Sequence, residues 1–340
     1  MPEEENENGN ETPEDVNSKG FVPRDKKYSE LADRYISGEV EPPAVLDNEL
    51  WLLHQLADLE DGLKDKIVDA LEKEDLWSRY LSQIYGVGPL LAANLISFIH
   101  PIERFKNVSK LWAYAGLSAV HWESECERGH KMITTSEPPT CKVKALDEKT
   151  HEHKVCGAKI VKSTYVPSPP KRKEGYVLLV NAKLHTTLWK LSDSFLKQRS
   201  DRSVYRRYYD QFRLDEERKN EQAEKKLRDA VLHARAMRKV QKMFLQHLLI
   251  VWGEGVGMKF PDPYPVQFLG RAPERPPMDR KHVLPERINP PQSPERLRFL
   301  VDSFYDIQKR RIETYNRIVA WIYTNRDRVL PQEAPAAKAQ

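Results

Sequence analysis

Long apolar runs are missing from this sequence. Its 340 residues have a mean hydropathy of −0.69, and no stretch of about twenty apolar residues occurs, so we expect no transmembrane helix and no membrane partner. The first residues lack a basic stretch followed by an apolar core, which argues against a secretory signal. We therefore expect a cytoplasmic protein. Its three cysteines would stay reduced there unless they bind a metal.

Excess charge of one sign is missing as well. Lys and Arg number 55 and Asp and Glu 51, a net charge of +4, which is too small to indicate a partner on its own, so the distribution matters. Residues 1–24 are rich in Glu, Asn and Pro with almost no large apolar side chain. Such a segment buries too little surface to fold. We expect a disordered acidic tail, which would either improve solubility or mask a basic surface.

Helical periodicity dominates much of the remaining chain. Residues 25–79 form an expected helical or coiled-coil segment, because leucines and isoleucines recur there at spacings of three, four or seven. The pattern suits packing within one domain and pairing in a homodimer equally well. Residues 256–294 contain ten prolines from Pro261 onward and predict an extended linker. Residues 295–330 then predict a C-terminal amphipathic helix, followed by a loose tail at 331–340.

Two glycines mark a turn in the segment 80–255, which we expect to be the main domain. Gly86, Val87 and Gly88 precede Pro89 and an apolar helical stretch. Glycine permits a sharp turn and leaves backbone N–H groups unshielded, and proline suits the first position of a helix. This pattern is typical of a helix-hairpin-helix, in which free N–H groups and the positive helix end bind a phosphate. A tight turn buried in a core is the alternative.

The same stretch resembles a known family. The residues that carry the likeness are 84–93, Arg104-Phe105 and Leu111-Trp-Ala-Tyr-Ala-Gly-Leu117, with a weaker match at 181–188. They are similar to the C-terminal domain of the insertion-sequence-110/116/902 transposases, which include the Piv-type DNA invertases. The resemblance covers about residues 45–255. It implies DNA as a partner, a role in DNA transposition or recombination, and nucleoid association.

The resemblance also implies chemistry that this sequence only partly supports. In the family, an N-terminal ribonuclease-H-like domain supplies acidic residues that bind Mg²⁺, and few residues precede the matching region here. A ribonuclease-H-like partner protein would have to supply that half, and a guide RNA is a further partner to consider. The family's serine nucleophile corresponds best to Ser124, with Ser118 as second choice. Ser124 as an ordinary loop residue is the alternative, so whether the protein is an enzyme stays open.

All three cysteines lie in an insert at residues 121–175. Zinc prefers four Cys or His ligands in a tetrahedral arrangement, and such a site can order a small polar segment that has no core of its own. We predict a structural zinc site formed by Cys126, His130, Cys141 and Cys156. His151 or His153 could replace His130 as the fourth ligand. Unrelated reduced thiols are the alternative, because no Cys-x-x-Cys is present.

A basic aromatic helix follows the insert. Arg199, Arg202, Arg206 and Arg207 alternate with tyrosines in the segment 197–213. Arginine forms bidentate hydrogen bonds with phosphates, so we predict that these four side chains contact DNA. A solvated arginine face over a tyrosine core explains the spacing equally well.

The expected fold is therefore mostly α: a helix-hairpin-helix domain with long flanking helices and a small zinc-stapled insert that contains β-strands. The expected function is DNA binding related to insertion-sequence transposases. A non-catalytic nucleic-acid-binding module of a mobile element, replication or repair system is the alternative.

Overall fold

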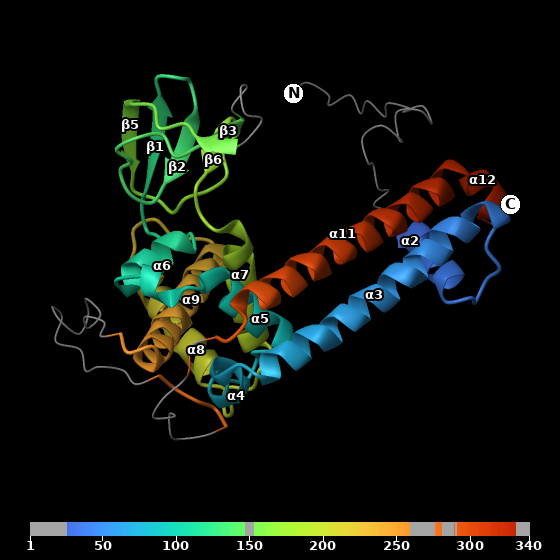
Figure 1. Cartoon of the computed structure of the whole chain (residues 1–340), viewed down its shortest axis with the longest axis horizontal. Coiled ribbons are helices and arrows are strands. Elements are labelled where there is room, and N and C mark those ends of the chain that lie inside the picture. Colours follow the sequence, from blue (N-terminus) through green and yellow to red (C-terminus); the bar gives the residue numbers. More distant parts are fainter. Residues whose placement is uncertain (1–25, 147–152, 259–275, 281–288, 290, 331–340) are drawn as a thin grey trace, which may run out of the picture. The chain divides into compact units, whose positions relative to one another are not determined.

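The computed structural model describes residues 26–146, 153–258, 276–280, 289 and 291–330 (Figure 1). The predicted tails at 1–24 and 331–340 and most of the predicted linker lie outside these residues. The chain divides into two compact units, one formed by residues up to Lys66 together with those from Asp302, the other running from Ile67 to Val301. Among the helices described, none combines the length and apolar character needed to cross a membrane.

The first unit is built from helices. It contains α2 (Lys26–Ile36), η1 (Ala44–Leu46), most of α3 (Asp47–Glu72), most of α11 (Pro294–Thr324), and α12 (Arg326–Val329). Asp47 and Glu49 lie in the first turn of α3, where a negative charge favours the helix dipole. The core of the unit consists of Tyr28, Leu31, Ala32, Tyr35, Leu46, Leu50, Leu53, Ile318, Val319 and Ile322.

The second unit holds the remaining helices. They are α4 (Asp75–Arg79), η2 (Leu81–Gln83), α5 (Pro89–Ile99), η3 (Ile102–Arg104), α6 (Val108–Tyr114), α7 (Ala182–Leu196), α8 (Val204–Glu221) and α9 (Asp229–Gly255). Three of these helices start where the sequence offers an N-cap, because Asn107, Asn181 and Ser203 each accept a hydrogen bond from a backbone N–H three residues on. Helix α9 packs against α6, α7 and α8 (Figure 1).

The insert contains two small sheets. Strands β1 (His121–Cys126), β2 (Lys131–Thr134), β5 (Ile160–Val166) and β6 (Tyr176–Leu178) form a sheet in the order β5-β1-β2-β6. β1 is antiparallel to both neighbours, whereas β2 and β6 are parallel. β3 (Lys144–Leu146) pairs with β4 (His153–Val155) in a separate hairpin. The prediction of a mostly helical protein with a small β-containing insert is confirmed.

Candidate nucleic-acid interface and metal centre

The Gly86–Gly88 turn lies between η2 and α5, and its two glycines have different roles. Gly86 has a φ of +93°, and a Cβ there would lie 3.0 Å from Phe195 Cδ1 of α7. Only glycine satisfies both the left-handed conformation and this close approach. Gly88 has an ordinary φ of −90° and is the N-cap of α5, and a Cβ there would meet nothing within 4 Å. The first glycine therefore serves packing, whereas the second faces open space.

The backbone groups of the turn are only partly paired, and at its first end the Gly86 N–H has no acceptor among the described residues. The Tyr85 N–H donates to Asp279 Oδ2 at 2.6 Å, and Gly86 O accepts the Ser194 hydroxyl at 2.7 Å. At the other end, the N–H groups of Gly88, Leu90 and Leu91 have no hydrogen-bond acceptor within the part of the chain that is described. All three residues are partly exposed. Unpaired donors at the N-terminus of an eleven-residue helix are suited to an anion.

Asp279 joins this turn to the start of α8. Its carboxylate accepts the N–H of Val204 at 2.8 Å as well as that of Tyr85, and its own N–H donates to Gln83 O at 3.1 Å. Burial raises the pKa of Asp279, although these N–H donors oppose the rise. No sequence pattern indicates this contact, because Asp279 lies in a segment whose composition predicts a linker.

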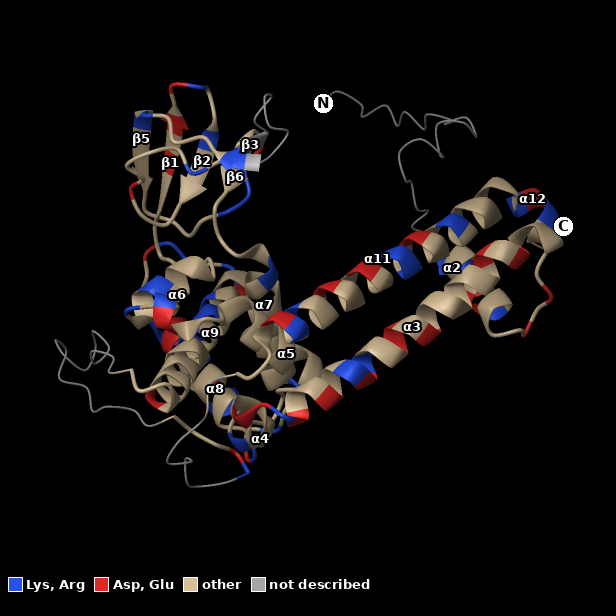
Figure 2. Ribbon diagram, in the orientation of Figure 1, with Lys and Arg blue, Asp and Glu red and all other residues tan. Residues whose placement is uncertain are grey.

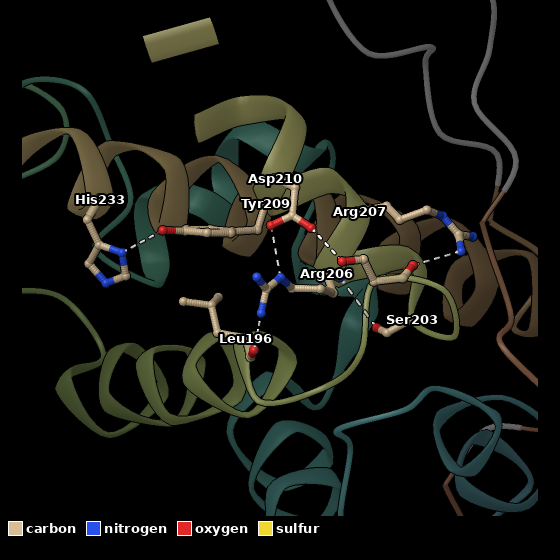
Figure 3. Close-up of polar contacts among 8 residues, drawn as sticks. Leu196, Ser203, Arg206, Arg207, Tyr209, Asp210 and His233 are labelled. Atoms are coloured by element: carbon tan, nitrogen blue, oxygen red, sulfur yellow. Dashed lines mark hydrogen bonds and ion pairs between the residues drawn. The ribbon is translucent and has the colours of Figure 1, made fainter. Parts of the chain in front are cut away.

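Three of the four predicted DNA-contacting arginines form contacts within the protein, and Figure 3 shows those of Arg206 and Arg207. Arg206 pairs with Asp210 at 2.9 Å and donates to Leu196 O. Arg207 donates to the Ser200 carbonyl at 3.3 Å. Arg199 pairs with the exposed Asp201 at 2.9 Å. Only the exposed Arg202 side chain has no partner among the residues described, so the DNA contact stays a prediction for all four.

The predicted metal ligands come together. The donor atoms of Cys126, His130, Cys141 and Cys156 all lie within 4.8 Å of one another, so this cluster could hold a metal ion. The loop between β1 and β2 brings in His130, because Gly129 turns with a φ of +77° and the Cys126 N–H donates to His130 O at 3.1 Å. A second turn at Gly157 (φ +66°) brings Cys156 beside Cys141, since the Gly157 N–H donates to Cys141 O at 3.0 Å.

The environment of the thiols suits ligation. Cys126 and Cys141 are 2% and 0% exposed and form a small core with Met132 and Val143. Burial acts to raise the pKa of Cys126, but hydrogen bonds from the backbone of His130 and Arg128 outweigh it and lower the pKa. Burial raises the pKa of Cys141 to about 11. A cation at the centre would favour the thiolate form of each cysteine.

The two alternative fourth ligands are described only in part. His151 lies outside the described residues, and only the backbone of His153 is described, at the start of β4. His130 Nδ1 lies 3.8 Å from Cys141 Sγ. Two ligand atoms of one tetrahedral zinc ion lie about 3.8 Å apart when both are sulfur and somewhat closer when one is nitrogen, so His130 fits the fourth position.

Ser124 lies in the middle of β1, and its side chain is enclosed. It is 1% exposed, and its hydroxyl is hydrogen-bonded to Ser163 on β5 at 3.0 Å. The nearby Glu123 is ion-paired with Lys173 at 2.5 Å. The second candidate, Ser118, accepts the Val120 N–H at 3.4 Å in the loop before β1. A phosphate could reach the Ser124 hydroxyl only if the groups that enclose it moved.

The two separated blocks of the family resemblance meet in the structure. Asn181 caps α7 and also donates through Nδ2 to the Tyr114 hydroxyl at 2.6 Å. One turn later, His185 Nδ1 lies 2.9 Å from Ala115 O. Gly116 (φ +72°) allows this approach, because a Cβ there would lie 3.3 Å from His185 Nδ1 and from Val180 Cγ2. The helix after the insert is thus fixed to the end of α6.

A comparison with protein families gives a match over part of the chain. No curated protein and no solved structure matches the chain. The match is to the family described as Transposase IS116/IS110/IS902, and it covers residues 78–138, from the end of α4 to the loop after β2. It includes the glycine turn, α5, α6 and two of the four candidate metal ligands, and it supports a transposase-related role. Residues 78–138 of this chain thus match the IS116/IS110/IS902 transposase family, and the match supports a likeness to the C-terminal domain of that family.

Proposed function

We propose that this protein binds DNA through the glycine turn as a helix-hairpin-helix, in a process related to DNA transposition or recombination. The observation that carries the proposal is the set of unpaired N–H groups of Gly88, Leu90 and Leu91 at the start of α5, inside the segment that matches the transposase family. A phosphate oxygen would accept hydrogen bonds from these groups and interact favourably with the helix dipole. Such contacts position a protein on DNA without reading its sequence.

A charge placed at Gly88 tests this proposal without disturbing the fold. The backbone at Gly88, with φ −90° and ψ 168°, is one that an N-cap aspartate adopts, and a Cβ there has open space. The Gly88→Asp carboxylate would cap the free N–H groups and repel a phosphate. We expect an unchanged or higher unfolding temperature and a loss of binding to a labelled duplex in fluorescence anisotropy.

Gly62→Asp is the matched control. Gly62 is exposed on α3 of the first unit, a Cβ there also has open space, and the added charge is the same. Weakened binding in Gly88→Asp but not in Gly62→Asp supports a phosphate at the turn. Equal binding by the wild type and both variants would place DNA elsewhere, and failure of the wild type to bind any duplex would end the proposal.

Whether the protein also catalyses a reaction on DNA is a separate question. In one reading Ser124 attacks a DNA phosphate, and a ribonuclease-H-like partner supplies the Mg²⁺-binding acidic residues, with a guide RNA as a further component. In the other the protein is a non-catalytic nucleic-acid-binding module. The enclosure of Ser124 against Ser163 favours the module. A serine-linked adduct with a suicide DNA substrate that is absent from Ser124→Ala would instead support the nucleophile.

We also propose that the Cys126, His130, Cys141 and Cys156 cluster binds zinc in a structural role. Three thiols and one imidazole are the donors that zinc prefers, and four protein ligands leave no open position for a reacting water. The insert has few buried apolar residues of its own, so the metal would supply much of its stability. Metal analysis of purified protein should give close to one zinc per chain.

A further inference from the structure

Helix α9 carries a pair of cations that no ion pair among the described residues accounts for. Arg238 and Lys242 lie one turn apart, so their side chains share one face of the helix. Both are partly buried. Neither has a carboxylate partner in the described part of the chain. Helix α6 packs against this part of the second unit (Figure 2).

Trp112 of α6 contacts Lys242, one of the two cations. Its indole N–H donates to the Lys242 carbonyl at 2.9 Å, which locks the ring onto α9. The Lys242 ammonium lies 5.1 Å from the centre of the same ring. This cation–π contact positions the ammonium but does not neutralise it. The tryptophan therefore holds a positive charge in place beside a second one.

Two other cations of the second unit have carboxylate partners. Lys239, the neighbour of Arg238, pairs with the buried Glu216 at 2.5 Å, and Arg213 pairs with Glu217 at 2.7 Å. By contrast, burial lowers the pKa of Arg238, and burial together with the charge of Arg238 lowers the pKa of Lys242. Two like charges taken partly out of water without an anion cost stability. An arrangement of this kind is typical of a site that receives its anion from a ligand.

We propose that Arg238 and Lys242, the second of which Trp112 holds in place, bind a phosphate of the DNA backbone. Arg238 would supply a planar fork for two phosphate oxygens, and Lys242 a point charge. The proposal rests on DNA binding as proposed above and adds a second contact, on α9, to the one at the start of α5. It also differs from the sequence-based prediction, which placed the cationic contacts on Arg199, Arg202, Arg206 and Arg207.

The test replaces each cation by methionine, which keeps the length and apolar stem of the side chain. Arg238→Met and Lys242→Met should each weaken binding to a labelled duplex about tenfold or more, the loss of one charge-assisted hydrogen bond. The double variant should also reduce the slope of log K against log salt by about 0.9, the value for the one phosphate that the pair binds. Unfolding temperatures should stay equal or rise, because an unpaired charge leaves a partly buried site.

Arg218→Met is the control, since Arg218 is an exposed cation of α8 and its loss changes the net charge equally. Arg238→Lys should recover much of the affinity. If the wild type binds DNA but both methionine variants match it in affinity and salt slope, the α9 site is refuted while the turn can still be tested through Gly88→Asp. If the wild type binds no DNA, both proposals fail. If Arg238→Met does not fold, Lys242→Met decides the question alone.

Discussion

Substitution of Gly86 by alanine should destabilise the second unit far more than the same change at Gly88. At Gly86 the backbone is left-handed at φ +93°, which costs an alanine about 1–2 kcal/mol. The new Cβ would also lie 3.0 Å from Phe195 Cδ1 and 3.3 Å from the Ser194 carbonyl oxygen. Overpacking of this kind costs about 1–3 kcal/mol. The expected loss in the free energy of unfolding is therefore about 2–5 kcal/mol.

At Gly88 neither the cost of a left-handed backbone nor the cost of overpacking applies. The φ of −90° is available to any residue, and the site is open. Alanine is only a poorer N-cap than glycine, so we expect a change within about 1 kcal/mol. Urea unfolding followed by circular dichroism measures both variants. An unfolding midpoint for Gly86→Ala equal to that of Gly88→Ala would refute the assignment of Gly86 to packing and of Gly88 to access.

Three further predictions concern the rest of the second unit. Cys141→Ser should lower bound zinc from about one to well under half an equivalent by metal analysis, whereas Ser118→Ala should leave it unchanged. Burial acts to raise the pKa of Glu216, but Lys239 and Arg235 outweigh it and lower the pKa below its usual 4.5. That pairing therefore stabilises the fold above pH 4.5, and the contribution is lost as the pH falls through the lowered value. Glu216→Gln should reduce stability at neutral pH and flatten this acid limb in unfolding scans. Ser124→Ala should remove one hydrogen bond to Ser163 and lower stability by about 1 kcal/mol, with DNA affinity unchanged; an affinity loss with stability intact would contradict the enclosed position.

A metal cluster could be predicted from the sequence because the residue types alone indicate which side chains can bind zinc. Three cysteines confined to one polar insert already indicated a shared site. The choice among His130, His151 and His153 depended on backbone turns that the sequence marks only by glycines. Gly129 and Gly157, both with positive φ, bring the ligands of two separate loops together. The composition therefore predicted a group of ligands, and the described part of the fold brings His130 into it as a candidate for the fourth.

The prediction that arginines of the segment 197–213 contact DNA overlooked their partners within the protein. Counting basic residues in the segment 197–213 ignores the acids that lie four residues away on the same helix. Asp210 follows Arg206 at that spacing, and Glu217 follows Arg213, and both pairs form. The i, i+4 rule could have identified them from the sequence. The contact of Asp279 with Tyr85 and Val204 could not be identified in this way, because no local pattern links residues so far apart.

The glycine turn offers a phosphate only backbone N–H groups, which limits its contribution to the salt dependence of DNA binding. Four N–H groups of the turn, those of Gly86, Gly88, Leu90 and Leu91, are unpaired within the described residues, and neutral donors add little to counterion release. The salt dependence of binding must therefore come from side-chain cations without internal partners. Arg202 on one phosphate and the Arg238–Lys242 pair on another would give a slope of about −1.8 in log K against log salt, at about 0.9 for each phosphate neutralised. A slope near −1.8 is the value expected if the internal pairs persist on DNA. A slope nearer −3.6 would require Arg206 and Arg207 to leave Asp210 and Ser200 for two further phosphates, which would place the arginines of α8 in the interface.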